Sequence, residues 1–371
     1  MNSAAKILFV DHNLEFSGSV VSMSYLVKGF VKNNFRAIVL SKLGERGKTY
    51  FESLGAEAIL YSNSNLKSIS LSFHISDKTK FLSIQWFKNL VKDILYFFNG
   101  IILSIRIINK IKPDLIYINE YVAIQFALYS RLKSIPVVVH IRSLFIDQKY
   151  NFRIFLLKKA LQKITSLNIA ITSLEASQIG NLENIKYKTL IVPEFLDDRD
   201  FEVPKNNDEI KSKFKINISD KVVLFLGGIS EIKGTKIFLD AIDKISYSNV
   251  KFIIAGPIKD YSKNKIISDY YKNCIELINS VKRTHSVDIL GNVNNVTELI
   301  SVSDILVSCS TKTHFSRPII EAWAQAKAII ASDILHNREL VTHDVNGILY
   351  SADDSNSLAK AIIELLEDDQ L

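Results

Sequence analysis

The sequence predicts an α/β protein of two domains, each a doubly wound parallel sheet covered by helices on both faces. Three observations lead to this prediction. Short runs rich in β-branched residues alternate with helical stretches along almost the whole chain. One polar stretch interrupts the alternation near the middle. The length of 371 residues exceeds what one ordinary hydrophobic core contains.

The first half of the chain carries the runs expected of one sheet. We expect strands at residues 6–12, 36–41, 56–61, 114–119, 136–142, 167–173 and 188–196. Each run is nearly continuously apolar, and helical stretches lie between most of them. This combination favours parallel strands, because their crossover helices bury both faces of the sheet.

The second half repeats the pattern after a polar stretch at 197–219. Strands are expected at 222–228, 251–256, 287–291, 304–310, 328–332 and 347–350. The polar stretch is the best boundary, so we predict domains at residues 1–200 and 201–371. Two such domains would face each other across a cleft, because doubly wound sheets bind ligands at the carboxyl ends of their strands.

Composition narrows the possible partners. A hydrophobic share of 47% with 23% charged residues is typical of a globular protein. The net charge of +7 suits an anionic partner such as a nucleotide diphosphate, a polyprenyl phosphate or an acidic lipid surface. Nucleic acid is not expected, because no compact Lys/Arg block has interleaved aromatic residues. Cys274 and Cys309 form no Cys-x-x-Cys, and the first residues lack the apolar run of a signal peptide, so we expect a cytoplasmic protein.

Residues 86–111 form a long apolar stretch that Lys92, Asp93 and Arg106 interrupt. Because a membrane span needs about 20 predominantly apolar residues, we predict that this stretch does not cross a bilayer. Two interpretations stay open. It is a buried helix, or it lies in the membrane surface with its Lys and Arg in water, as a peripheral contact with the inner face of the cell membrane.

The first candidate motif is VVLFLGGISEIKGT, residues 222–235. Gly227 and Gly228 follow a strand and would let the backbone approach a ligand closely. Lys233 precedes a helix whose N-terminal N–H groups attract anions, and its charge would stabilise a leaving diphosphate. The alternative is an ordinary strand-to-helix turn with a solvated lysine. The Walker spacing and the Gly-x-Gly-x-x-Gly pattern are both absent, which makes a dehydrogenase the weakest candidate.

The second candidate motif is THFSRPIIEAWAQAKAIIASD, residues 313–333. Pro318 stands where the first residue of a helix is expected. Glu321 would then lie in the first turn, where its carboxylate could accept two hydrogen bonds from a vicinal diol such as a ribose. The alternative is a carboxylate that only stabilises the N-terminus of the helix.

Together the two motifs resemble glycosyltransferase family four, the large retaining family with the GT-B fold. The segment from Gly227 to Gly234, with Lys233, is similar to the family's Gly-Arg-x-x-x-x-Lys-Gly loop, and Phe315 with Glu321-Ala322 to its later turn and Glu-Ala helix. More loosely, KILFVDHNLEFSGS resembles the family's first strand and glycine loop. The resemblance implies two Rossmann-like domains, an acceptor-binding one at 1–200 and a nucleotide-sugar-binding one at 201–371.

The sequence departs from the family's pattern at three positions. Gly228 stands where the family has an arginine, Thr313 where it has the first Glu of a pair, and Ser316 where it has the turn glycine. Despite these departures, the resemblance implies that Thr313, Phe315 and Ser316 contact the donor. Arg317 could replace the missing cation.

On the acceptor side, the resemblance implies that the backbone at Gly18 approaches the donor phosphates. His140 and Arg142 end a central strand, where family members often have a functional histidine, although a lone histidine is more often structural. Asp11 and His12 are weaker candidates. The Asp198-Arg199-Asp200 triplet lies in the polar linker, so we interpret it as solvated charge and expect neither a metal nor another cofactor.

These features predict an enzyme that moves a sugar, with retention, from a nucleoside diphosphate sugar to a hydroxyl of a glycan or polyprenyl-linked acceptor. We expect it to act in polysaccharide biosynthesis, with His140, Lys233 and Glu321 as catalytic residues. Two alternatives stay open: a catalytically impaired GT-B partner protein in a glycan pathway, and a nucleotide-sugar epimerase.

Overall fold

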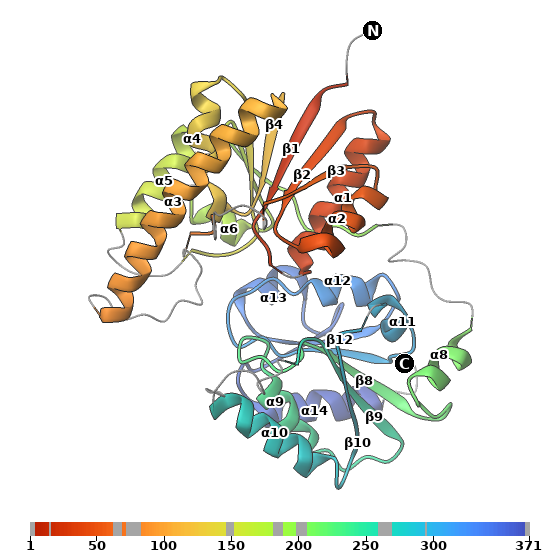
Figure 1. Cartoon of the computed structure of the whole chain (residues 1–371). Coiled ribbons are helices and arrows are strands. Elements are labelled where there is room, and N and C mark those ends of the chain that lie inside the picture. Colours follow the sequence, from red (N-terminus) through yellow and green to blue (C-terminus); the bar gives the residue numbers. More distant parts are fainter. Residues whose placement is uncertain are drawn as a thin grey trace. The chain divides into compact units, whose positions relative to one another are not determined.

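The computed structural model describes residues 4–14, 16–61, 69–71, 83–145, 152–180, 188–197, 206–258, 269–293 and 295–367. The chain divides into two compact units, Met1–Phe195 and Leu196–Leu371. Each unit contains one sheet with helices on both sides (Figure 1). The predicted boundary between residues 200 and 201 and the triplet Asp198-Arg199-Asp200 lie outside the described residues.

The N-terminal unit has a seven-stranded parallel sheet in the order β3-β2-β1-β4-β5-β6-β7 among its described residues. The strands are β1 (Lys6–Asp11), β2 (Arg36–Ser41), β3 (Glu57–Leu60), β4 (Leu115–Asn119), β5 (Val137–Ile141), β6 (Leu167–Ala170) and β7 (Thr189–Ile191). The helices are α1 (Gly18–Lys32), α2 (Gly44–Ser53), α3 (Ile84–Ile111), the short 3-10 helix η1 (Tyr121–Ala123), α4 (Gln125–Leu132), α5 (Phe152–Lys163) and α6 (Ser173–Ser177). Each of the seven predicted runs contains a strand, so the predicted parallel sheet is confirmed.

Each face of this sheet has its own core, because successive side chains of a strand point to opposite faces. Leu8 and Val10 of β1 pack with residues of α3, α4 and α5. Ile7 and Phe9 pack with residues of α1 and α2 on the other face. Figure 1 shows the two sets of helices on opposite sides of the strands.

The C-terminal unit repeats this architecture with a six-stranded parallel sheet in the order β10-β9-β8-β11-β12-β13 among its described residues. Its strands are β8 (Lys221–Leu226), β9 (Val250–Ala255), β10 (Ser286–Gly291), β11 (Ile305–Ser308), β12 (Ala328–Ser332) and β13 (Ile348–Tyr350). Its helices are α8 (Asn207–Lys213), α9 (Thr235–Ile242), α10 (Asp269–Val281), α11 (Val296–Ser301), α12 (Arg317–Trp323), α13 (Leu335–Leu340) and α14 (Ser355–Leu366). Each of the six predicted runs overlaps a strand, and three of these strands begin one residue earlier than predicted.

Again the two faces are covered separately. Val223 and Phe225 of β8 pack with residues of α9, α10 and α14, whereas Val222 and Leu224 pack with residues of α8, α11 and α12. This two-sided burial explains the continuous apolar composition of the strands, because neither face of the sheet is left to water.

The strand orders place one switch point in each sheet, where the chain reverses the direction in which it adds strands. In the N-terminal unit the switch point lies between β1 and β4, and in the C-terminal unit between β8 and β11. Loops that leave such neighbouring strands in opposite directions open a crevice at the carboxyl edge of the sheet. Both candidate motifs of the C-terminal unit follow switch-point strands.

Helix α3 is the apolar stretch on which the sequence left two interpretations. Its inner face is buried, with Leu103, Ile107 and Ile108 in the core. Only 22% of its most apolar window is buried, so most of the stretch is not inside the unit. By length and composition alone, Trp86–Ile111 is the one described helix that could cross a membrane.

Candidate functional site

The loop between β8 and α9 is held by its own polar groups. The Thr235 hydroxyl accepts from the Ser230 N–H at 2.9 Å and donates to the Gly228 carbonyl at 2.8 Å. Gly234, the N-cap of α9, has a φ of 75°, and a Cβ there would lie 2.0 Å from the Cys309 carbonyl oxygen. This glycine therefore lets the β8 and β11 loops touch, and their contact places Lys233 beside the second motif.

The glycine pair at the end of β8 has a packing explanation in the structure. Gly228 has a φ of 57°, and a Cβ on it would lie 2.3 Å from the Pro257 carbonyl oxygen. A Cβ on Gly227 would lie 2.3 Å from the Phe225 ring. Neighbouring protein atoms thus account for both glycines. Their predicted contact with a donor stays a prediction.

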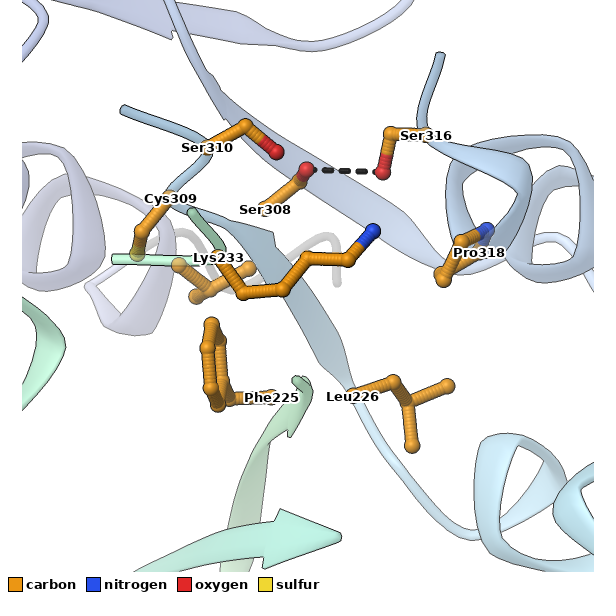
Figure 2. Close-up of a pocket in the computed structure, with 9 residues that line it drawn as sticks. Phe225, Leu226, Lys233, Ser308, Cys309, Ser310, Ser316 and Pro318 are labelled. Atoms are coloured by element: carbon orange, nitrogen blue, oxygen red, sulfur yellow. Dashed lines mark hydrogen bonds between the residues drawn. The ribbon is translucent and has the colours of Figure 1, made fainter. Parts of the chain in front are cut away.

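Lys233 lines a pocket formed where the β8 and β11 loops meet. Figure 2 shows its side chain reaching between the two motifs toward Ser316 and Pro318. The hydroxyls of Ser308 and Ser316 are hydrogen-bonded at 2.8 Å beside it. The enclosed space is about 10 Å³, the room of roughly one water molecule. The pocket by itself therefore has no room for a large ligand.

The charge of Lys233 is perturbed by its surroundings. Burial lowers the pKa of its ammonium from 10.5 to about 8, and the nearby Glu321 carboxylate opposes that shift. Lys233 in turn is the main reason why the pKa of His314 falls to about 3, with burial and His336 adding to the effect. At neutral pH the site therefore holds an ammonium beside a neutral imidazole. No pattern in the sequence singled out His314, which lies one residue before Phe315.

Lys233 and Glu321 thus lie close enough to influence each other's charge, as the sequence predicted for a shared site. Glu321, however, is not in the first turn of its helix, because α12 begins at Arg317 and Pro318 is its second residue. The predicted position was wrong by one residue at the start of the helix. The Glu321 carboxylate accepts a hydrogen bond from Arg317 Nε at 2.7 Å.

Arg317 is itself buried, and its ion pair with Glu321 already engages its charge. The idea that Arg317 replaces a missing cation therefore requires that pair to be shared with a ligand. Phe315 is buried, and Thr313 is partly exposed. The donor roles predicted for Thr313, Phe315 and Ser316 stay predictions.

In the N-terminal unit, polar side chains gather at the switch point between β1 and β4. Asp11 is fully buried, and one carboxylate oxygen accepts from Asn13 at 2.6 Å and from Asn119 at 3.2 Å. Burial raises the pKa of Asp11 and lowers the pKa of His12 to about 4. Gly18 is the exposed first residue of α1, just beyond this cluster. Its predicted approach to a phosphate stays a prediction.

His140 and Arg142 are both buried in the same unit. The His140 ring lies against the Tyr117 hydroxyl, and Arg142 Nη2 is 3.1 Å from His140 Nδ1. Burial, assisted by the Arg142 charge, holds the pKa of His140 well below its usual value, so the ring is neutral. Among the described residues, its Nε2 has no hydrogen-bond partner. With 3% of His140 exposed, the predicted catalytic contact would need a ligand that reaches behind the surface.

Arg142 is the centre of a buried network that the sequence did not reveal. Its guanidinium donates to Asn119 Oδ1 at 2.9 Å and Ser22 Oγ at 2.8 Å, and it forms an ion pair with Glu194. Glu194 lies 52 residues further along the chain, next to the end of the unit. No local pattern marks this pairing.

Glu120 is a second residue that sequence analysis missed. It has a φ of 93°, which is unusual for a residue other than glycine, and it directly follows β4. Its carboxylate accepts from the Tyr121 N–H at 3.1 Å and from the Ser143 hydroxyl at 3.0 Å. Burial raises the pKa of Glu120 to about 8, so a protonated carboxyl stands at the carboxyl edge of the sheet. Across the described ranges, no group of three or more His, Cys, Asp or Glu side chains could hold a metal ion.

Two doubly wound units, each with polar residues at its switch point, define a protein of the GT-B class. The crystal structure of HepE from Anabaena in complex with UDP and glucose has this fold. It superposes with a TM-score of 0.75 over 99% of this chain and 91% of that chain, at 20% identity. Residues 206–371 match the family described as Glycosyl transferases group 1.

Curated proteins also match part of the chain. N-acetyl-alpha-D-glucosaminyl L-malate synthase of Bacillus anthracis is 23% identical over 178 residues, 48% of this chain and 44% of that protein. A Campylobacter jejuni protein, N-acetylgalactosamine-N,N'-diacetylbacillosaminyl-diphospho-undecaprenol 4-alpha-N-acetylgalactosaminyltransferase, is 25% identical over 193 residues, 52% of this chain and 50% of that protein. The matched part of the chain thus spans half or less of the length of these relatives.

Proposed function

We propose that the chain is a retaining glycosyltransferase that moves a sugar from a nucleoside diphosphate sugar to a hydroxyl of a glycan or lipid-linked acceptor. The observation that supports it most is the position of Lys233. Its partly desolvated ammonium lies at the switch point of the second sheet, in the pocket where the loop after β8 meets the loop after β11. Each of these loops leads into a helix. An anion such as a diphosphate is the ligand that this arrangement favours.

The leaving diphosphate would be the group that Lys233 stabilises. As the bond to the sugar breaks, negative charge grows on the phosphate oxygen, and a nearby ammonium lowers the energy of that state. Glu321, held by Arg317, is proposed to bind the ribose hydroxyls. In retaining members of the family the departing phosphate is thought to take the acceptor proton, which requires no protein base.

Relatives guide the choice of donor and acceptor. The structural neighbour from Anabaena was solved with UDP, so a UDP-sugar is the first donor to test. The Campylobacter relative is named as a transferase that acts on a diphospho-undecaprenol compound. A polyprenyl-linked acceptor in polysaccharide assembly is therefore the first acceptor to test. We propose that the N-terminal unit binds this acceptor and that the protein works at the cytoplasmic face of the membrane.

Replacing Lys233 by methionine tests the proposal, because this substitution removes the charge and retains most of the side-chain volume. We expect sugar release from the donor, or transfer to an acceptor, to fall about 100-fold or more. The control is Lys244→Met, an exposed lysine of the same unit whose Nζ bonds only the Ser355 hydroxyl at 2.7 Å in the described structure. Unchanged turnover in the Lys233 variant would refute the assigned role.

The same assays separate the two alternative functions. Binding of UDP-sugars in calorimetry, with neither transfer nor hydrolysis over a broad acceptor panel, would favour the catalytically impaired partner protein. This alternative rests on Gly228 and Thr313, which stand where the family has an arginine and a glutamate. Conversion of the donor sugar to an isomer without any acceptor would favour an epimerase.

A further inference from the structure

Helix α3 presents a continuous apolar stripe to solvent. The stripe begins at Ile84, ends at Ile105 and includes between them Phe87, Val91, Ile94, Leu95, Phe98 and Ile102. Each of these side chains is between 37% and 78% exposed. Steps of three and four residues keep the stripe on one face of the helix, over about 30 Å at 1.5 Å per residue.

Helix α5 widens this face. Phe152, Phe155 and Leu156 are each at least half exposed. The ion pair between Arg153 and Asp93 joins α5 to α3, and Figure 1 shows the two helices side by side. Eleven of the 23 exposed large hydrophobic residues in the described structure lie on these two helices, so the exposure is concentrated and not scattered. We call this surface the α3–α5 face.

The same two helices carry an unbalanced charge. Between them they contain eight Lys or Arg residues and one acidic residue, which leaves a net charge of +7. The whole chain has that same net charge, so the remainder of the sequence sums to zero. The one acid, Asp93, is buried and paired with Arg153. The described surface of the two helices therefore exposes cations and no acidic side chain.

The cations lie along one border of the stripe. At 100° per residue, Lys88, Lys92, Arg106 and Lys110 fall on the flank next to Ile84, Leu95 and Ile102. All four are exposed. Their long side chains can reach phosphates at a headgroup level while the stripe lies deeper.

We propose that the α3–α5 face lies on the surface of an anionic lipid bilayer, with the stripe in the acyl boundary and the flanking cations at the phosphates. A crossing helix does not fit, because Leu103, Ile107 and Ile108 anchor the inner face in the core of the unit. A protein partner fits less well, because lysines are depleted from protein interfaces and no exposed acid here would fix a register. The inference is independent of the proposed sugar transfer.

Cosedimentation of the full chain with vesicles tests this surface. We expect binding to vesicles of phosphatidylcholine with phosphatidylglycerol, and weaker binding to phosphatidylcholine alone. The variant Leu95→Glu/Phe98→Glu is expected to bind about tenfold or more weakly, because it places two charges in the stripe. Its matched control, Ile218→Glu/Val345→Glu, changes two apolar residues of the other unit that are even more exposed, and it should bind like the wild type.

A second measurement, the quenching of tryptophan fluorescence by brominated lipid, tests whether the α3–α5 face contacts the bilayer. The chain has two tryptophans, Trp86 and Trp323, and the variant Trp86→Phe/Trp323→Phe/Phe87→Trp carries a single tryptophan that lies in the stripe. Brominated phosphatidylglycerol should then quench its fluorescence in the wild-type background and leave it unquenched in Leu95→Glu/Phe98→Glu. A wild-type protein that ignores both kinds of vesicle overturns the proposal. So does a stripe variant that binds normally, or a stripe that instead joins two copies of the chain in sedimentation velocity.

Discussion

At the scale of single residues, the candidate site depends on one lysine whose charge is poised near physiological pH. Lys233 combines a pKa of about 8 with a position between two loops. Its ordinary value is 10.5, so the folded protein releases this proton more than two pH units earlier than a free lysine does. Because the neutral imidazole of His314 has a pKa of about 3, it stays uncharged over the same range.

The affinity for UDP should therefore depend on pH in a defined direction. Only the ammonium form of Lys233 attracts a diphosphate, so the dissociation constant should rise about tenfold between pH 7.5 and 9. Without ligand, the free energy of unfolding should rise with pH between about 8 and 10.5. In this range the unfolded chain holds the proton more firmly, so the penalty that the buried ammonium imposes on folding disappears as the pH rises.

Calorimetric titrations at several pH values, with two variants, check this expectation. Lys233→Arg should bind UDP with little change over the window, because a guanidinium keeps its proton. If Lys233→Met kept the wild-type pH dependence, another group would be responsible.

The buried pair of Arg142 and Glu194 makes a prediction about stability. Arg142→Met leaves the Glu194 carboxylate without its cation. The Glu194 side chain is only 6% exposed, so water cannot replace that partner. We expect a loss of about 3–5 kcal/mol, a fall of roughly 10 °C in the unfolding temperature of the N-terminal unit. Arg142→Met/Glu194→Gln should recover part of that loss in calorimetry. A double variant no more stable than the single one would show that the charge of Glu194 is not the cause.

At the scale of elements, the contact between the β8 and β11 loops determines the geometry of the candidate site. Gly234 allows this contact, because its backbone lies in the left-handed region and a Cβ would meet backbone that cannot move aside. The two helices that follow, α9 and α12, start beside the pocket only because these loops touch.

Gly234→Ala should therefore separate the loops. We expect it to destabilise the C-terminal unit by about 2 kcal/mol or more and to weaken UDP binding. Gly29→Ala is the matched control, because a Cβ on that α1 glycine would meet nothing within 4 Å. That change should stabilise α1 by about 0.5–1 kcal/mol. Thermal unfolding of both variants gives the comparison, and equal effects would argue against the loop contact.

At the scale of the whole molecule, the two units are predicted to respond differently to a nucleotide. All proposed diphosphate contacts except Gly18 belong to the C-terminal unit. A ligand at 100 times its dissociation constant stabilises the state that binds it by about 2.7 kcal/mol.

A screen with UDP-, GDP- and dTDP-sugars should therefore raise the unfolding temperature with the preferred base. Hydrogen exchange in the bound state should slow mainly at residues 227–235 and 309–318. Protection confined to the N-terminal unit would move the donor site there. Lys233→Met should abolish the shift, and Lys244→Met should retain it.

Sequence alone was sufficient for the architecture because the determining patterns are local. Every predicted run overlaps a strand, because a short, apolar, β-branched segment between helices favours a buried strand over other conformations. The glycine-lysine loop and the Pro318 helix start were visible for the same reason, apart from a shift of one residue in α12. Lys233 and Glu321 could be placed in one domain, and their proximity was expected from the family resemblance of the two motifs.

Contacts between distant residues decided the rest. The sequence did not indicate that Arg142 pairs with Glu194, that the charge of Lys233 acts on His314, or that Glu120 adopts a positive φ, because each depends on neighbours brought together by the sheet. Nor did it show which side of α3 is covered. That stretch is apolar around much of its circumference, and only the packing of Leu103, Ile107 and Ile108 against the sheet leaves the opposite stripe in water. The local periodicity of the sequence shows which residues are apolar, whereas tertiary packing determines which of them are buried.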